Sequence, residues 1–596
     1  MRLVLVVGIC ALGVLCFLYQ YRAQFFIDSD EGIVGLMALH LTQGSSVPMF
    51  YYGQHYIGPA EALTASLFFS IFGSSSQSLK LAPFLFTVLA FVFGVITVNN
   101  LFGRKAAIIF TILFTVPGQF MTEWFCKARG NFSYTIFATS LAIYFLERHF
   151  NGKSLFLLGL FVGFSWWQNG QITSLMIAIG FALGFSKKTI FYAVGLGVGL
   201  LPVAVYNFAN DFATFEQLGK RNFSNIVENI NSFFSGFLPI LLGFARTFHD
   251  PGWTAWLAAV LVLASVAGEL RLRLKVSTLV NILNVVIFLL LFSISEFGKL
   301  SQEPRYGMSV WFSITMLTAS FLNRLGNVGV LVLLFVASCR FLSYFIEGQF
   351  KPTGTQIIAP SSRIPRDTKG FVQALQSLGV SRVRTPYWNA YNLVFISDET
   401  IQAELIREPY TPRIRYFDHS DLVTVPVLDH KSTNRYYSEL SKKSGLDVEV
   451  TEVFDNMSLY RFQRKDLNRF NHFTVASEFN TPDLYKLKDD DMSTYWHADR
   501  PVNEGVLLTI TEFSCAKGIY LCVSKFDNDF PQTVILKHGG GEDVMDADWI
   551  NFLKSTRCLD FLFQNPARDY LTMVVKNMEI KRFFPSISEL KLISCE

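Results

Sequence analysis

Residues 59–72 read PAEALTASLFFSIF, and the placement of this stretch decides the topology of the N-terminal part of the chain. The stretch is apolar but only about 14 residues long, whereas a helix needs roughly 20 residues to cross a bilayer. A short apolar helix of this kind fits an orientation along the membrane surface. We therefore expect residues 59–72 to lie in the membrane interface.

Long uncharged apolar runs fill the chain up to about Phe345, and charged residues crowd the remainder. Of the 596 residues, 51% are hydrophobic and 16% are charged, which is more apolar surface than a soluble core can bury. Without residues 59–72, these runs predict eleven membrane spans. The spans begin near Leu3, Leu81, Ala106, Phe132, Leu155, Ile172, Ile190, Trp253, Ser277, Met308 and Val328. The first run, Leu3–Leu18, is interpreted as a retained signal-anchor helix.

The basic residues of the linkers support this path. On it, the side that holds Arg2 also receives Arg104, Lys105, Lys187, Lys188, Arg271 and Arg324. Cytoplasmic loops carry an excess of Lys and Arg, whereas counting residues 59–72 as a span would export nearly all of these loops. The extracytoplasmic face then receives the loop 20–80 and the whole C-terminal tail.

The chain thus predicts a polytopic α-helical membrane domain at residues 1–346 and a polar tail. The tail is expected to form a small α/β domain at residues 352–464 and a β-sandwich at residues 470–596. Its four cysteines (Cys515, Cys522, Cys558 and Cys595) can form up to two disulfides in an extracytoplasmic compartment. A net charge of +4 without a dense basic run argues against a nucleic-acid partner.

An acidic cluster, Asp28-Ser29-Asp30-Glu31, follows the first apolar helix directly. A carboxylate there lies at the boundary between headgroups and water, where a general base could meet a lipid-borne substrate. The alternative is structural: the acids keep the loop outside and cap the next helix, with Asp30 near its N-terminus.

Aromatic and hydrogen-bonding residues precede the interfacial stretch. Gln54, His55, Tyr56 and Glu61 are candidate substrate-binding residues, together with Asp28. Such a mixture suits a sugar, and an aromatic belt at headgroup depth is the simpler alternative.

Two outer turns carry cations against the topological trend: Lys127 and Arg129 in one, Arg305 with Tyr306 in the other. Arginine binds phosphate through two parallel hydrogen bonds, so these residues could hold a phosphate whose hydrocarbon tail stays in the bilayer. Snorkelling of long basic side chains to the headgroups explains each residue separately. The span interiors hold almost no ionisable residues, which argues against an ion-coupled transporter.

Taken together, these motifs resemble those of the GT-C superfamily of membrane glycosyltransferases, such as protein O-mannosyltransferases and aminoarabinose transferases. The resemblance covers roughly Met1–Phe345. Its motifs are Asp30-Glu31 after the first helix, Gly32 to His40 leading to Gly44, the stretch Tyr52 to Glu61, Phe72-Gly73, Arg129-Gly130 and Pro304-Arg305-Tyr306. The Lys-Pro-Pro of the aminoarabinose enzymes is replaced by Gly58-Pro59-Ala60, so their substrate is not implied.

The end of the tail is similar to discoidin-type β-sandwiches, which often bind glycans. The matching segments are Thr474 to Ser477, Asp489 to Trp496 and Ile587 to Leu590. The Asp-Gly-Asp form of the signature is missing, and packing alone can account for these motifs.

The GT-C resemblance implies transfer of a sugar from an undecaprenyl- or dolichyl-phosphate donor to a lipid, glycan or protein acceptor, with inversion. Asp30 is then the general base, with Glu31 or Asp28 as its substitute, and Lys127, Arg129, Arg305 and Tyr306 bind the donor phosphate. The alternatives are a membrane-anchored glycan-binding or assembly protein and a lipid-linked sugar flippase.

No cofactor is implied by the residues, and no Cys/His spacing suggests zinc. Beyond the Asp-x-Asp spacing of the acidic cluster itself, no nucleotide-sugar motif stands out in the outer loops, so a nucleotide donor is not expected, and dependence on a divalent metal stays open. A bacterial inner membrane is favoured over the endoplasmic reticulum.

Overall fold

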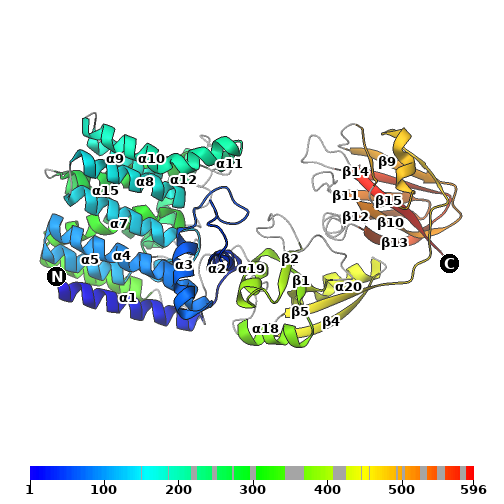
Figure 1. The fold of residues 1–596 in the computed structure, drawn as a ribbon, viewed down its shortest axis with the longest axis horizontal. Helices are drawn as coiled ribbons and strands as arrows, with labels where there is room; N and C mark the ends of the chain where they lie inside the picture. Colours follow the sequence, from blue (N-terminus) through cyan, green and yellow to red (C-terminus); the bar gives the residue numbers. More distant parts are fainter. Residues whose placement is uncertain are drawn as a thin grey trace. The chain divides into compact units, whose positions relative to one another are not determined.

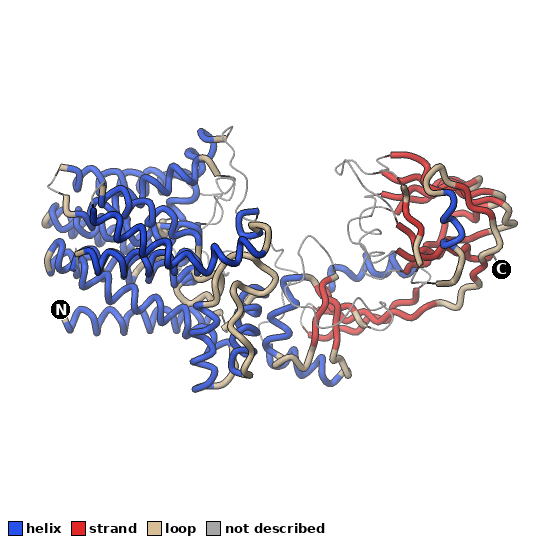
Figure 2. Tube along the Cα trace, turned by 45° about the horizontal axis from the view of Figure 1, so that its top comes forward, coloured by secondary structure: helices blue, strands red, loops and turns tan. Residues whose placement is uncertain are grey.

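The computed structural model describes residues 1–595, apart from residues 24, 149–150, 185–186, 217–224, 245–251, 272–273, 296–303, 343–367, 407–424, 444–445, 455–456, 492–493, 500–503, 524–532, 546–557 and 577–585. Two compact units make up the chain, Met1–Ile358 and Ala359–Glu596. The first is built from helices and the second contains the strands (Figure 2). The predicted boundary between residues 346 and 352 lies outside the described residues.

Helices account for nearly all of the regular structure described in the first unit. They are α1 (Arg2–Arg22), α2 (Ser29–Thr42), α3 (Ala60–Phe72), α4 (Ser76–Phe102), α5 (Arg104–Thr115), α6 (Gln119–Trp124), α7 (Phe132–Arg148), α8 (Gly152–Gln168), α9 (Thr173–Leu183), α10 (Lys187–Ala209), α11 (Ala213–Glu216), α12 (Ile226–Ser232), α13 (Leu238–Leu241), α14 (Gly252–Leu270), α15 (Val276–Ser293), α16 (Met308–Arg324) and α17 (Asn327–Leu342).

Eleven of these helices occupy the places of the predicted spans: α1, α4, α5, α7, α8, α9, α10, α14, α15, α16 and α17. Within the described part of the chain, five helices are long and apolar enough to cross a membrane, namely α1, α4, α10, α14 and α15. The protein is a multi-pass membrane protein, and the count of eleven spans stays a prediction.

The stretch that decides the topology forms helix α3, which is 13 residues long. It lies at the end of the helical unit where α2 lies and where α1 ends (Figure 1). Its buried side carries Ala62, Ala65 and Phe69, whereas Leu67 and Ile71 are 66% and 70% exposed. An exposed apolar side on a short helix is what contact with lipid at the membrane surface requires.

Helices α8 and α10 pack closely because glycines line both contact faces. A Cβ added to Gly159 would lie 2.1 Å from the carbonyl oxygen of Tyr192, and one added to Gly195 would lie 2.0 Å from that of Phe156. Gly163 and Gly199 repeat this contact one turn further along. Small residues four positions apart let helix backbones approach each other in a membrane, where no hydrophobic force drives helices together.

The second unit contains a mixed sheet and two antiparallel sheets. The mixed sheet has the order β2-β1-β3-β5-β4, with β1, β2 and β3 parallel. Its strands are β1 (Arg382–Thr385), β2 (Gln402–Leu405), β3 (Val427–His430), β4 (Leu446–Phe454) and β5 (Met457–Arg464), and its helices are α18 (Thr368–Ser377), α19 (Tyr387–Ile396) and α20 (Asn434–Lys443). This part corresponds to the predicted α/β domain.

The two antiparallel sheets have the orders β13-β10-β15-β6, with β8 also paired to β15, and β12-β11-β14-β9-β7. Their strands are β6 (Arg469–Phe470), β7 (Thr474–Ala476), β8 (Trp496–His497), β9 (Glu504–Thr511), β10 (Ala516–Val523), β11 (Thr533–His538), β12 (Gly541–Met545), β13 (Cys558–Ala567), β14 (Tyr570–Lys576) and β15 (Ser586–Ser594). One hydrophobic core joins them and extends to Tyr437 and Tyr460 of the α/β part.

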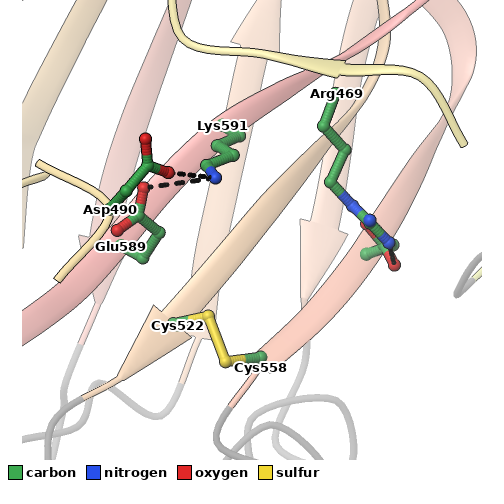
Figure 3. Close-up of a disulfide and its surroundings, with 7 residues drawn as sticks. Arg469, Asp490, Cys522, Cys558, Glu589 and Lys591 are labelled. Atoms are coloured by element: carbon green, nitrogen blue, oxygen red, sulfur yellow. Dashed lines mark hydrogen bonds and ion pairs between the residues drawn. A yellow bond between two sulfur atoms is a disulfide. The ribbon is translucent and has the colours of Figure 1, made fainter. Parts of the chain in front are cut away.

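Two disulfides link strands of the sandwich. Cys522 of β10 pairs with Cys558 of β13 (Figure 3), and Cys515 pairs with Cys595 near the end of the chain. The pairing uses all four cysteines that the sequence placed in the tail. The cysteines of the helical unit, by contrast, are free thiols.

Candidate functional site

The acidic cluster forms the beginning of helix α2. The Asp28 side chain caps the helix by accepting a hydrogen bond of 3.0 Å from the Glu31 backbone N–H, and the Glu31 carboxylate accepts one of 3.3 Å from the Asp28 N–H. This reciprocal arrangement is a capping box, which satisfies two N–H groups that a helix start leaves unpaired. The alternative that acids of this cluster cap the next helix is confirmed: Asp28 is the cap, and Asp30 lies in the first turn, near the N-terminus.

A loop between α6 and α7, Phe125–Asn131, brings two cations to these acids. Lys127 Nζ and Arg129 Nη1 each lie 3.1 Å from Asp28 Oδ2. Arg129 Nη2 lies 2.6 Å from Asp30 Oδ2, so one guanidinium bridges both aspartates. The structure thus brings together four residues that the sequence placed on the same face of the membrane.

Glu31 has a partner that sequence reasoning missed. Lys80 lies near the start of α4, and its Nζ is 2.8 Å from Glu31 Oε1. The backbone N–H of Ala128 donates to the same oxygen over 3.1 Å. Both charged side chains are almost fully buried, where an unpaired charge would cost several kcal/mol. A lysine inside a long apolar run was the available signal, because such a residue needs a buried partner.

Glu123, at the end of α6, completes the network. Its Oε1 lies 3.0 Å from Lys127 Nζ, and its Oε2 accepts a hydrogen bond of 3.1 Å from the Tyr19 hydroxyl. We refer to the following residues as the charged cluster: Asp28, Asp30, Glu31, Lys80, Glu123, Lys127 and Arg129. With four carboxylates and three cations, the cluster carries one excess negative charge when all its groups are ionised.

The cations keep Asp28 ionised. Burial alone would raise the pKa of Asp28, but the positive charges of Lys127 and Arg129 outweigh burial and hold this pKa well below its ordinary value. Burial would likewise lower the pKa of Lys127, whereas the carboxylates of Asp28 and Glu123 raise it above its ordinary value. Both groups are therefore charged at neutral pH.

Access to solvent separates the three acids of α2. The Asp30 side chain is 22% exposed, whereas those of Asp28 and Glu31 are 4% and 2% exposed. Among these three acids, Asp30 therefore offers the most reachable carboxylate. A cavity adjoins the cluster from the side of α1, and its polar lining comes from Tyr19, Gln20, Glu31, Lys80, Glu123 and Lys127.

The predicted substrate-binding segment lies between α2 and α3. His55 Nδ1 is 2.6 Å from the Tyr206 hydroxyl of α10. Gln54, His55 and Tyr56 are half-buried, and the Gln54 Oε1 atom is buried without a hydrogen-bond partner among the described residues. Glu61 is fully buried. The segment is thus anchored to the helical body and retains polar groups that a ligand could satisfy.

Arg305 and Tyr306 lie in a short helical turn, Pro304–Gly307, before α16. The Arg305 guanidinium carbon is 5.6 Å from the centre of the Trp124 ring and 5.3 Å from that of Tyr306. Lys127 Nζ also lies over Trp124, at 5.5 Å. Trp124 is therefore a common neighbour of two of the predicted phosphate-binding residues, although their sequence positions are far apart.

The described residues contain no group of three or more His, Cys, Asp or Glu side chains that could hold a metal ion. The acids of the charged cluster are engaged with Lys and Arg instead. The chemistry that this arrangement supports is proton transfer and the binding of charged groups through side chains.

Comparison with solved structures identifies the fold. None of the known family profiles and no curated protein matches the chain. ArnT from Cupriavidus metallidurans bound to undecaprenyl phosphate is similar with a TM-score of 0.54 at 12% identity, over 76% of this chain and 97% of ArnT. Its apo state gives a TM-score of 0.53 over the same shares, also at 12% identity. The chain therefore has the fold of the GT-C membrane glycosyltransferases.

Two further solved structures are similar at lower TM-scores. The arabinofuranosyltransferase AftD from Mycobacteria matches 99% of this chain and 59% of its own length, with a TM-score of 0.39 at 11% identity. The Archaeoglobus fulgidus oligosaccharyltransferase matches 77% of this chain and 73% of its own length, with a TM-score of 0.44 at 14% identity. The conclusion on the fold depends on ArnT alone.

Proposed function

We propose that the protein is an integral-membrane glycosyltransferase, which moves a sugar from a polyprenyl-phosphate donor to an acceptor at the extracytoplasmic surface. The observation that carries this proposal is the position of Asp30. Its carboxylate lies at the accessible edge of the charged cluster, and Arg129 orients it through a contact of 2.6 Å. A general base needs such a defined position within hydrogen-bond reach of the acceptor.

In the proposed reaction, Asp30 accepts a proton from an acceptor hydroxyl or amine. The acceptor atom forms a bond to the anomeric carbon of the sugar, and the bond from this carbon to the phosphate oxygen breaks. Because attack and departure occur on opposite faces of the sugar, the configuration of the anomeric carbon inverts. Glu31 is a poorer base because its oxygens already accept contacts from Lys80 and from backbone N–H groups.

The leaving group is a lipid phosphate, whose negative charge needs stabilisation. Arg305 is the proposed first contact, because its described ring contacts hold the guanidinium beside Trp124 and Tyr306. Lys127 and Arg129 are already paired with carboxylates, so a phosphate would share these cations with Asp28. Gln54, His55 and Tyr56 are proposed to contact the sugar.

The fold supports the class of donor. ArnT, which has this fold, is known in a form bound to undecaprenyl phosphate. The Lys-Pro-Pro of aminoarabinose enzymes is missing from the present chain, so the sugar and the acceptor are left unassigned. The two disulfides of the second unit support an oxidising, extracytoplasmic location for the tail, and a bacterial inner membrane is the proposed site.

The test uses purified protein with radiolabelled undecaprenyl-phosphate sugars and measures donor consumption and transfer separately. Asp30→Asn removes the base but keeps the size of the side chain, so we expect transfer to fall by about 100-fold or more. Glu147→Gln is the matched control, because Glu147 pairs with Lys275 and Ser277, outside the charged cluster.

The outcomes separate the competing functions. Undiminished transfer by Asp30→Asn would contradict the proposed base. Binding of labelled glycans without any donor consumption would indicate a glycan-binding or assembly protein. Movement of the lipid-linked sugar across vesicle membranes without chemical change would indicate a flippase.

A further inference from the structure

Glu61 lies at the first turn of the interfacial helix α3 and is 0% exposed. Like Asp28 and Glu31, it is an acid of the first outer loop that the structure buries in polar contacts, yet it does not belong to the charged cluster. Its hydrogen bonds connect α3 to the end of the Phe125–Asn131 loop. Two properties of Glu61 therefore matter: whether its carboxyl group is protonated, and how its hydrogen bonds affect the conformation of the loop.

Two hydrogen bonds in opposite directions connect Glu61 and Asn131. The Glu61 backbone N–H donates to Asn131 Oδ1 over 3.0 Å, and the Asn131 backbone N–H donates to Glu61 Oε2 over 3.1 Å. Asn131 Nδ2 also donates to the carbonyl oxygens of Gly58 and Gln168 over 2.6 Å and 2.9 Å. The loop end is thus tied to the segment before α3 and to the end of α8.

The backbone at this point needs such support. Asn131 has a φ of 57° and Gly130 a φ of 74°, so two consecutive residues adopt left-handed conformations. Glycine adopts this region freely and asparagine tolerates it. The reciprocal hydrogen bonds with Glu61 select this backbone conformation. Because Arg129 immediately precedes this turn, the backbone conformation of Gly130 and Asn131 also affects where the Arg129 side chain leaves the backbone.

The surroundings of the Glu61 carboxyl group favour its neutral form. Oε2 accepts hydrogen bonds from Asn131 and from the Tyr51 hydroxyl at 2.9 Å, whereas Oε1 is buried without a hydrogen-bond partner among the described residues. The groups that act on the pKa of Glu61 are the Asn131 backbone N–H, the Tyr51 hydroxyl and the Glu31 carboxylate, and no cation of the described residues is among them. Burial raises the pKa of Glu61 to about 8, against the opposing effect of the hydrogen bonds, and the Glu31 charge adds to the rise.

We propose that Glu61 is a positioning residue whose carboxyl group fixes the turn at Asn131, and thereby places Arg129 between Asp28 and Asp30. On this view Glu61 does not contact the substrate, which differs from the role that its sequence position suggested. The inference rests on the proposed function, because positioning of Arg129 matters for transfer only if Asp30 is the base. The same bonds connect α3, which exposes apolar side chains, to the charged cluster.

The first experiment does not depend on activity. Hydrogen–deuterium exchange of the Phe125–Asn131 backbone is measured in the full-length wild-type protein and in Glu61→Ala and Glu61→Gln. Glutamine keeps an oxygen that can accept from Asn131 and Tyr51, so we expect exchange within about twofold of wild type, whereas alanine should accelerate exchange by about tenfold or more. Glu147→Ala is the control and should leave this loop unchanged.

The second experiment measures transfer by the same variants. Rescue is the informative readout: Glu61→Gln should keep kcat and KM within about twofold of wild type, and Glu61→Ala should lower kcat by about tenfold or more. If Glu61→Ala cannot be purified, Tyr51→Phe and Asn131→Ala replace it, since each removes part of the same network.

Two results would overturn the inference. One is normal exchange of the loop in Glu61→Ala or in the replacement variants. The other is loss of activity in Glu61→Gln with a normally protected loop, because a charge or proton on Glu61 would then serve the substrate directly. If the wild-type protein transfers no sugar at all, the proposed function fails, and the exchange experiment still decides whether Glu61 positions the loop.

Discussion

The charged cluster of the helical unit and the Glu589 carboxyl group of the sandwich are both buried, but their surroundings differ. In the cluster, Asp28 has two cationic nitrogens at 3.1 Å. The Glu589 side chain is 3% exposed, and the ammonium group of Lys591 lies 3.8 Å away, closer to Asp490 than to Glu589 (Figure 3). Neither Glu589 oxygen has a hydrogen-bond partner among the described residues.

The difference shows what keeps a buried acid charged. The pKa of Asp28 is lowered because two cations outweigh burial. Burial raises the pKa of Glu589 to about 7; Lys591 opposes this rise, and the nearby acids Asp490 and Asp489 add to it. Burial alone therefore does not decide whether an acid is charged. The position of the cations does, and the cations of the cluster all come from other elements than α2.

The largest effect on transfer is expected from removing the cation that bridges two aspartates. Arg129→Met leaves Asp28 with Lys127 alone and frees the Asp30 carboxylate from its orienting contact. Breaking a buried ion pair from one side costs about 3–5 kcal/mol, and loss of the oriented base should lower transfer by about 100-fold. Thermal unfolding and radiolabel transfer measure the two effects. Arg104→Met, an exposed cation, is the control, and equal behaviour of both variants would contradict the role of Arg129.

A smaller effect is expected at Lys80. Lys80→Met leaves the buried Glu31 carboxylate without its ammonium partner at 2.8 Å, which should cost about 3 kcal/mol of the free energy of unfolding. Adding Glu31→Gln removes the unpaired charge, so the double variant should be more stable than Lys80→Met alone. Thermal unfolding of the wild-type protein, of each single variant and of the double variant gives the coupling free energy between Lys80 and Glu31. A double variant less stable than the single one would contradict the stabilising role of the Lys80–Glu31 ion pair.

A third prediction concerns the disulfides, whose reduction should affect the stability of the second unit and not that of the helical unit. Reduction of Cys515–Cys595 and Cys522–Cys558 should destabilise the sandwich by about 2–4 kcal/mol for each disulfide. The helical unit should keep its unfolding temperature, because its cysteines are free thiols. Thermal unfolding with and without reductant, with mass spectrometry to establish the number of reduced cysteines, tests this. An unchanged sandwich after full reduction would contradict the prediction.

The sequence predicted the elements better than the contacts between them. The short helix α3 was predictable, because 13 residues between a proline and a glycine cannot span a bilayer, and its place in the interface stays a prediction. Asp28, Asp30 and Glu31 were also found, because their place after the first helix is a local signal. Most positions of the proposed site were therefore visible in the sequence.

The partners of these residues were not visible. Asp28 binds Lys127 and Arg129 across about 100 residues, and only the packing of helices brings these segments together. Lys80 was missed because a single lysine at the start of an apolar run is usually attributed to topology. Asn131 was missed because its role depends on a left-handed φ and on a bond to Glu61, neither of which has a sequence signature.

The smallest effect is expected at Glu589, and its sign distinguishes it from the charged cluster. Because the pKa of Glu589 is raised to about 7 in the folded protein, the folded state holds this proton more tightly than the unfolded state does. The associated stability is complete below the ordinary pKa of glutamate and is lost as the pH rises towards 7. Glu589→Gln does not titrate, so the wild-type protein should lose roughly 1–2 kcal/mol relative to this variant between about pH 5 and about pH 8. The unfolding transition of the sandwich, followed at several pH values, measures this loss.

A comparison of the wild-type protein with Asp28→Asn provides the opposite case. The pKa of Asp28 is lowered in the folded protein, so the stabilising effect of this carboxylate is present at neutral pH and is lost only in strong acid. If the stability of the wild-type protein relative to each variant changed with pH in the same direction, the contrast between an acid with two cations at 3.1 Å and an acid with one ammonium at 3.8 Å would be wrong.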